Sequence, residues 1–147
     1  GEELMARCHS MWALMRIADR TLVRVEDAPL GFENEPILTT ETPLRPRAPS
    51  ELAFRTVGER SIVWSDLDYN MHMNNTRYMD WIDDLLPSAF HENHIVKEFT
   101  VCYLSETREG QNLDLHWDFV EEGCLQVDAH RETDGKDERV FSARLLF

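Results

Sequence analysis

Residues 64–78 read WSDLDYNMHMNNTRY, a stretch that sets ionisable and amide side chains directly before a predicted helix. If residues 68–72 run extended, the side chains of Asp68, Asn70 and His72 leave on one side, because alternate residues of an extended chain share a face. A carboxylate, an amide and an imidazole would then converge. We therefore expect a functional site in this stretch.

The helix is predicted from the apolar residues that follow, which recur at steps of three and four. These residues are Tyr78, Ile82, Leu85 and Ala89. Asn74 or Asn75 is expected to cap the first turn, since an Asn side chain accepts hydrogen bonds from the first unpaired backbone N–H groups. The N–H groups that remain free there are candidates to hold a developing negative charge.

The pattern D-x-N-x-H-x-N-N-x-x-Y over residues 68–78, followed by Trp81, resembles the motif of plant-type and bacterial acyl-ACP thioesterases. The resemblance implies an α+β hot-dog fold, in which an antiparallel sheet wraps around one long helix. It also implies hydrolysis of the thioester of fatty acyl-ACP, with release of free fatty acid in fatty acid biosynthesis. The resemblance is strongest from about Ile62 to Gly110.

Glu106 is implied as a further site residue. It stands where the first long strand after the helix should end, and its distance from His72 along the chain is similar to that of the catalytic Glu in the plant-type enzymes. Many of those enzymes have Cys directly after this Glu, whereas this chain has Thr107. A thiol nucleophile at that position is therefore excluded.

These residues predict carboxylate-driven attack of water on a thioester. Glu106, held by His72, would act as general base, and Asn70 would help to place the water. Backbone N–H groups near Asn74 and Asn75 would stabilise the oxyanion. The resemblance leaves two roles open for Asp68: it orients its neighbours, or it attacks directly as a covalent nucleophile.

The C-terminal half alternates apolar and polar residues, which predicts β-strands. Strands are expected over residues 95–105, 112–119, 125–130 and 140–147. Gly110, Gly123 and the pair Asp134-Gly135 mark the turns between them. We expect an antiparallel meander after the helix.

The chain divides into three predicted regions. The apolar period of residues 1–27 fits a helix and a strand equally well, but a pattern at residues 6–12, with 20–25 returning, resembles the terminal strands of a first hot-dog domain, incomplete here. Residues 28–50 hold five prolines and are predicted to be a linker. Residues 51–147 are expected to form a whole hot-dog thioesterase domain, so the sequence is interpreted as a fragment of a double hot-dog protein.

Composition sets further limits. A net charge of −13 over 147 residues argues against nucleic acid as a partner, because phosphates require a local excess of Lys and Arg. Neither a membrane span nor a leader is apparent, and three cysteines without C-x-x-C spacing favour reduced thiols, so we expect a cytoplasmic protein. No cofactor is expected. The residues His91-Glu92-Asn93-His94 lack the spacing of H-E-x-x-H, so no metal site is expected either.

The expected partner is an acyl carrier protein that carries a fatty acyl chain. Such carriers are acidic, so an acidic thioesterase needs a local basic patch to bind one. The candidates are Arg45, Arg47, Arg55, Arg60, Arg77, Lys97 and Arg108. A lone hot-dog domain also leaves a sheet edge and an apolar face to cover, which predicts a homodimer.

Two other functions stay open at this point. One is a thioesterase that acts on acyl-CoA, and the other is a non-catalytic acyl-binding or assembly module. Several apolar residues are either plain core or the lining of an acyl tunnel. They are Met71, Met73, Met79, Trp81 and Phe99.

Overall fold

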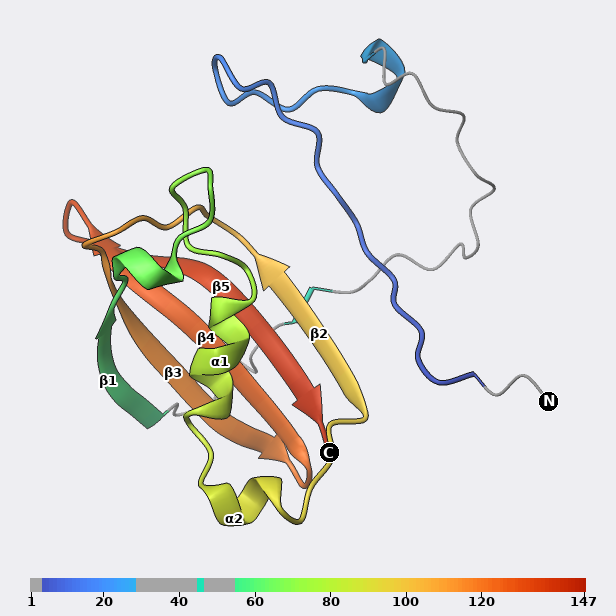
Figure 1. Cartoon of the computed structure of the whole chain (residues 1–147). Helices are drawn as coiled ribbons and strands as arrows, with labels where there is room; N and C mark the ends of the chain where they lie inside the picture. Colours follow the sequence, from blue (N-terminus) through green and yellow to red (C-terminus); the bar gives the residue numbers. More distant parts are fainter. Residues whose placement is uncertain (1–3, 29–44, 47–54) are drawn as a thin grey trace. The chain divides into compact units, whose positions relative to one another are not determined.

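The computed structural model describes residues 4–28, 45–46 and 55–147 (Figure 1). Contacts divide the chain into two units, residues 1–44 and 45–147. The linker predicted over residues 28–50 lies mostly outside the described residues.

In the N-terminal unit, residues 4–28 turn back on themselves once. Met15 and Leu22 form an antiparallel bridge, and the N–H of Val23 donates to the carbonyl of Leu14 at 2.9 Å. A short 3-10 helix, η1 (Val25–Asp27), follows. The expected strand over residues 6–12 is not formed, because a lone pairing buries too little apolar surface to sustain long strands.

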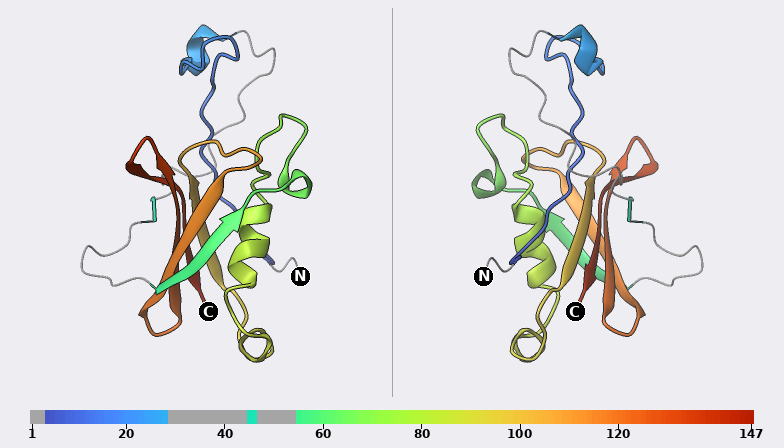
Figure 2. Two further views of the ribbon diagram at one scale, coloured as in Figure 1. Left: turned by 90° about the vertical axis from the view of Figure 1, so that its left-hand side faces the viewer. Right: turned by 90° about the vertical axis from the view of Figure 1, so that its right-hand side faces the viewer.

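The second unit contains one five-stranded sheet in the order β1-β3-β4-β5-β2, with every neighbouring pair antiparallel. The strands are β1 (Arg55–Ser61), β2 (Glu98–Tyr103), β3 (Asn112–Glu121), β4 (Cys124–Thr133) and β5 (Lys136–Leu146). The helices are η2 (Trp64–Asp66), α1 (Arg77–Asp83) and α2 (Ser88–His91). Figure 2 shows α1 lying on one face of the sheet. This arrangement is the hot-dog fold, as the resemblance implied.

The core lies between α1 and the sheet. Tyr78, Trp81 and Ile82 of α1 are buried, and they pack in one cluster with residues such as Leu113 and Phe141 of the strands. Full burial of each large apolar side chain contributes about 1.5–3 kcal/mol. The amphipathic pattern therefore fixes which side of α1 faces the sheet.

The helix is shorter than expected. α1 has seven residues, and a turn separates it from α2, whose N-cap is Pro87. Proline lacks an N–H group and disfavours helical geometry at the residue before it, so the chain cannot continue as one helix through Leu86. Ala89, which the pattern placed on the buried face, is exposed.

The strand order also differs from a simple meander. β3, β4 and β5 form consecutive hairpins, and the Asp134-Gly135 turn has φ of 52° and 72°, as the turn prediction requires. β2 spans six residues, fewer than predicted, and pairs with β5 from Glu98↔Leu146 to Tyr103↔Phe141. Residues 104–111 therefore carry the chain from one edge of the sheet back toward β3.

The sheet face opposite α1 holds a polar group, here called the outer-face cluster, built around the buried carboxylate of Asp128. Its Oδ1 accepts from Gln126 Nε2 at 3.0 Å and from Ser142 Oγ at 2.5 Å, and its Oδ2 lies 3.2 Å from Arg139 Nη1. Gln126, Asp128 and Ser142 are at most 2% exposed. Mutual hydrogen bonds offset the cost of burying these groups.

Candidate active site

The motif residues 67–73 form a tight turn. Leu67 and Met73 pair as a β-bridge, the N–H of Asp68 donates to the carbonyl of His72 at 2.8 Å, and Met71 has φ of 63°. The expectation of an extended segment over residues 68–72 was therefore wrong. Alternation cannot distinguish a strand from a turn that the side chains themselves stabilise.

Asp68 is the side chain that stabilises this turn. Its Oδ1 accepts from the N–H of Asn70 at 2.8 Å and from the N–H of His72 at 3.3 Å. Aspartate commonly closes turns in this way, because its carboxylate replaces a backbone acceptor. Asn70 is exposed at the tip, and its side chain makes no hydrogen bond to a described residue.

His72 and Glu106 lie together although they come from different parts of the chain. The Nε2 of His72 is 3.2 Å from Oε2 of Glu106, and the two side chains are 13% and 44% exposed. The distance suits an ion pair, but the atoms are not aligned as a regular hydrogen bond. The arrangement combines a nearly buried imidazole with a carboxylate that water can reach.

A backbone bond ties the two segments of this pair together. Thr107, which follows Glu106, accepts through its carbonyl from the N–H of Met73, which follows His72, at 2.8 Å. The Thr107 side chain is buried, and its hydroxyl lies 2.9 Å from the hydroxyl of Tyr78. Thr107 therefore faces the core, and its hydroxyl is engaged there.

Two tyrosines make hydrogen bonds to residues beside the His72–Glu106 pair. Tyr78 stacks on Phe141 with ring centroids 4.4 Å apart, and burial raises its pKa above the usual 10.0, which keeps the hydroxyl protonated at neutral pH. The ring of Tyr103, on β2, lies 5.8 Å from that of Tyr78. The Tyr103 hydroxyl donates to the carbonyl of Asn75 at 3.1 Å.

The segment before α1 differs from the predicted cap. The N-cap is Thr76, and Asn74 Oδ1 accepts from the N–H and the hydroxyl of Thr76 at 3.0 and 2.9 Å. The N–H of Asn74 donates to the carbonyl of Asp66 at 2.8 Å, so it is not free to bind an oxyanion. The N–H of Asn75 has no acceptor among the described residues. Of the two predicted oxyanion donors, only Asn75 keeps a free N–H.

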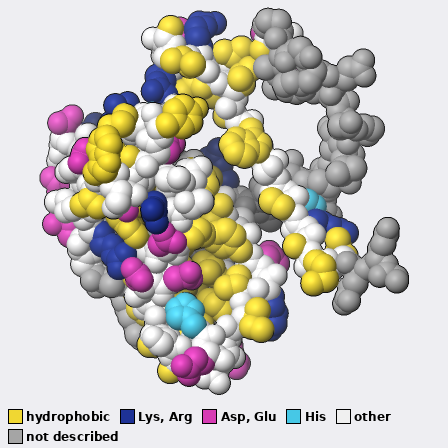
Figure 3. Space-filling view, in the orientation of Figure 1, with side chains coloured by type: hydrophobic (Ala, Val, Ile, Leu, Met, Phe, Trp, Pro, Cys, Tyr) yellow, Lys and Arg dark blue, Asp and Glu magenta, His cyan; other side chains and the backbone are white. Residues whose placement is uncertain are grey.

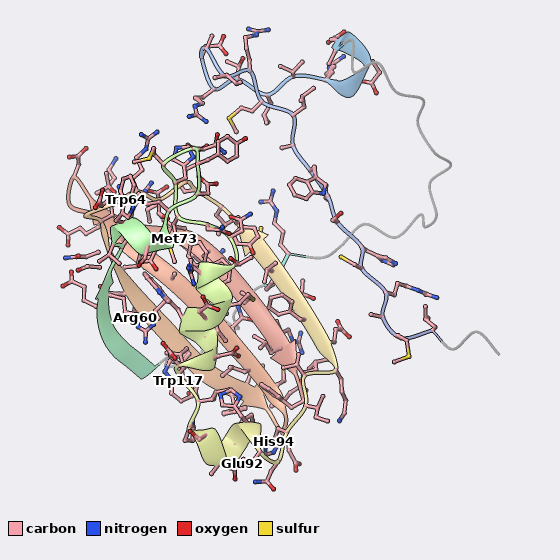
Figure 4. All side chains as sticks on the ribbon, in the orientation of Figure 1. Arg60, Trp64, Met73, Glu92, His94 and Trp117 are labelled. Carbon is pink, nitrogen blue, oxygen red and sulfur yellow. The ribbon has the colours of Figure 1, made fainter. Side chains whose placement is uncertain are left out.

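The basic residues near α1 are paired with acids. Arg60 Nη2 lies 3.0 Å from Asp84, and Arg77 Nη1 lies 2.8 Å from Asp80. Figure 4 shows Arg60 beside α1, where its guanidinium also lies 5.5 Å from the ring centre of Trp81. These two arginines present little free positive charge to a partner.

Four of the five apolar candidates separate into two groups, while Met79 is partly buried and packs against the core. Met73 and Trp81 are at most 7% exposed and belong to the core, whereas Met71 and Phe99 are 44% and 43% exposed. Figure 3 shows hydrophobic side chains at the surface between α1 and β2. Tyr103, the last residue of β2, is also 41% exposed.

The histidines after α1 are accounted for by backbone contacts. His91 Nε2 lies 3.0 Å from the carbonyl of Asp83, and His94 Nδ1 lies 2.9 Å from the carbonyl of Phe90, on whose ring it stacks. In the described part of the chain, no group of three potential ligands could hold a metal ion, and no helix is long and apolar enough to cross a membrane.

Sequence reasoning missed Tyr103 and Arg131 as residues around the site. Arg131, on β4, donates to the carbonyl of Glu106 at 2.8 Å. Neither residue belongs to the motif, and only the strand order brings them to it. The alternating pattern of their strands carried no signal for this role.

A sheet wrapped around a helix defines the class of hot-dog domains, and the histidine–carboxylate pair lies beside the start of that helix. A crystal structure of an acyl-ACP thioesterase from Bacteroides thetaiotaomicron superposes with a TM-score of 0.70 at 25% identity, over 90% of this chain and 52% of that one. The 4-hydroxybenzoyl CoA thioesterase shares the fold at 14% identity, with a TM-score of 0.55 over 63% of this chain and 80% of that one.

Residues 52–146 match the family model of the acyl-ACP thioesterase C-terminal domain, and the chain belongs to this family. Among curated relatives, the chloroplastic dodecanoyl-[acyl-carrier-protein] hydrolase of Cinnamomum camphora is 31% identical over 110 residues. The chloroplastic palmitoyl-acyl carrier protein thioesterase of Arabidopsis thaliana is 29% identical over the same length. The chain covers 29% and 27% of the lengths of these two relatives, and 71% of the chain is matched in each case.

Proposed function

We propose that this protein hydrolyses the thioester of fatty acyl-ACP and releases free fatty acid, as part of fatty acid biosynthesis. The observation that carries the proposal is the 3.2 Å approach of His72 Nε2 to Glu106 Oε2 inside a domain of this family. The names of the relatives support acyl-ACP as the substrate.

In the proposed reaction, Glu106 removes a proton from water as the water oxygen bonds to the thioester carbonyl carbon. His72 holds the carboxylate in place. The carbon–sulfur bond then breaks, and the proton passes from Glu106 to the leaving thiolate. The products are the free fatty acid and the carrier thiol.

The Asn75 N–H is the proposed donor to the oxyanion, and Tyr103 holds the carbonyl of the same residue, on the following peptide. A donor of this kind typically contributes about 3 kcal/mol to transition-state stabilisation. Asn70 is proposed to help place the water. The main-chain hydrogen bonds of Asp68 favour an orienting role over a nucleophilic one.

Direct comparison of acyl-ACP and acyl-CoA hydrolysis tests the function. We expect faster turnover of acyl-ACP by the native chain and loss of activity in Glu106→Gln and Asp68→Asn. Full activity in both variants would reject the site. Preference for acyl-CoA would reassign the substrate, and tight binding of fatty acid without turnover would indicate an acyl-binding module.

Labelled water distinguishes the two roles of Asp68. If water attacks directly, a single turnover in heavy-oxygen water places the label in the fatty acid alone. Label in the carboxylate of Asp68 would instead show that this residue is a covalent nucleophile.

We further propose a homodimer, because the edge strand β2 exposes the apolar residues Phe99 and Tyr103. A monomer in sedimentation experiments would refute it. A cytoplasmic location is proposed from the free thiols of Cys8, Cys102 and Cys124, since disulfides mark oxidising compartments. Fractionation of cells would check it.

The proposed division of the chain keeps residues 1–27 as the end of a first hot-dog domain, 28–50 as a linker and 51–147 as the thioesterase domain. The boundary between contact units at residues 44 and 45 supports a break near the linker. The mass of the native gene product tests the division, and a mass no larger than that of this chain would contradict it.

A further inference from the structure

Glu106 lies in residues 104–111, a segment without helix or strand, and its side chain is 44% exposed. An exposed glutamate on such a segment would sample many positions unless its backbone were held. A general base must stay within hydrogen-bond distance of the proton it removes. The question is therefore what fixes this segment.

Arg131 contacts the segment at three points. Its Nη1 donates to the carbonyl of Glu106 at 2.8 Å and to Oε1 of Gln111 at 3.2 Å, and its Nη2 donates to Oγ of Ser105 at 2.9 Å. The segment is thus held near both of its ends. The Arg131 side chain is 14% exposed, so solvent competes little for these bonds.

The guanidinium is itself oriented by the neighbouring strand. Arg131 and Glu138 are register partners on β4 and β5, and Arg131 Nε donates to Glu138 Oε2 at 2.8 Å. The hydrogen bond from Arg131 lowers the pKa of Glu138, which keeps this carboxylate ionised at neutral pH. A planar guanidinium held from one side presents its remaining N–H groups in a fixed direction.

Gln111 extends the same support along the segment. Its Oε1 also accepts from the N–H of Arg108 at 2.8 Å, and its carbonyl accepts from the N–H of Ile62 at 2.9 Å. Arg131, Gln111 and the Thr107–Met73 bond therefore hold the backbone on both sides of Glu106. The N–H groups of Arg131 donate to acceptors within the protein, so this residue positions the backbone and does not bind the substrate.

We propose that Arg131 is a positioning residue, which holds the carboxylate of Glu106 against His72 by fixing the backbone of residues 105–111. This inference rests on the proposed function of Glu106. It adds a residue from β4 that lies outside the motif and makes no claim on substrate binding.

The test compares Arg131→Met and Arg131→Lys with Arg144→Met. Arg144 is a suitable control because it is also a strand arginine in an ion pair, with Glu121 at 2.6 Å. In acyl-ACP hydrolysis, Arg131→Met should lower kcat by about 10- to 100-fold, since small displacements of a reacting group have effects of this size. KM should change by less than about threefold, as expected when ground-state binding is untouched.

Arg131→Lys, which keeps the charge and one donor, should have a kcat between those of the native chain and Arg131→Met. Arg144→Met should keep native activity. The proposal is wrong if kcat of Arg131→Met stays within about twofold of that of Arg144→Met, because positional loss should exceed this range.

A double variant separates positioning from general damage. In the Glu106→Gln background, Arg131→Met should lower the melting temperature as it does in the native background but should reduce the small residual kcat of that variant no further. An equal loss of kcat in both backgrounds would show that Arg131 does not act through Glu106.

A readout without catalysis keeps the test independent of the proposed function. The side-chain nitrogen resonances of His72 should shift in Glu106→Gln, and Arg131→Met should move them in the same direction, while Arg144→Met leaves them unchanged. If Arg131→Met leaves them at native values, the proposal fails whatever the activity. If they shift but no thioester is hydrolysed, the proposed function fails and the positioning stands.

Discussion

The hydrogen bond between Tyr78 and Thr107 allows a quantitative prediction. The two oxygens lie 2.9 Å apart, and the residues are 3% and 2% exposed, so water cannot replace either partner. Thr107→Val keeps the shape of the side chain but leaves the Tyr78 hydroxyl without a partner. Leaving a buried polar group unsatisfied costs about 1–3 kcal/mol, and Tyr78→Phe should cost a similar amount for the opposite reason.

The double variant should then cost less than the sum of the two single variants. Once both hydroxyls are gone, no buried group is left unpaired, so the expected coupling energy is about 1–2 kcal/mol. Urea unfolding measures each step. At a slope of about 2 kcal/mol per molar, a loss of 2 kcal/mol lowers the midpoint by about 1 M.

Thr100→Val, a half-buried threonine on β2, is the matched control and should change stability by less than about 0.5 kcal/mol. Single costs that add to within about 0.5 kcal/mol in the double variant would refute the reasoning. The pH dependence gives a second check. Burial raises the pKa of Tyr78, so the contribution of its protonated hydroxyl to the free energy of unfolding is complete below pH 10.0 and is lost as the pH rises above that value. Because Tyr78→Phe lacks this hydroxyl, its free energy of unfolding should fall less steeply than that of the native chain above pH 10.0.

Three further results are expected. Asp128→Ala should destabilise the domain by about 1–3 kcal/mol in urea unfolding, because it removes the acceptor that Gln126, Ser142 and Arg139 share in the outer-face cluster, and a loss below about 0.5 kcal/mol would contradict this. Arg131 depresses the pKa of Glu138 below 4.5, so the stability that the ionised carboxylate contributes is present above that pH and is lost as the pH falls further. In Glu138→Gln, the free energy of unfolding should therefore depend less on pH in this acidic range, and an unchanged pH dependence would argue against the Arg131–Glu138 pair. Tyr103→Phe should lower kcat severalfold by releasing Asn75 while unfolding changes by less than about 1 kcal/mol, and unaltered kinetics would remove Asn75 from the proposed site.

The sequence predicted the parts of the fold and of the site that depend on residues close together in the chain. Tyr78 and Ile82 lie on the buried face of α1 as their period requires, and the turn at Asp134-Gly135 follows from residues that tolerate positive φ. The motif pointed to His72, and the resemblance added Glu106. The two lie 3.2 Å apart in the structure.

The remaining parts depend on long-range pairing, which a local pattern cannot report. Alternation marks β2 and β5 as strands but does not say that they are neighbours, and that pairing is what carries Glu106 to its position. The turn at Asp68 was missed for a different reason: its side chain substitutes for a backbone acceptor, and an alternating pattern looks the same with or without that bond.

The pairing of β2 with β5 also sets an order of events. The N–H groups of Leu104 and Ser105 both donate to the carbonyl of Val140, so the start of the Glu106 segment is anchored on the last strand of the sheet. His72 precedes Val140 by most of the length of the domain and is therefore translated well before it. A ribosome must therefore release nearly the whole domain before the histidine and the carboxylate can meet, and a nascent chain that already has both residues still lacks the site.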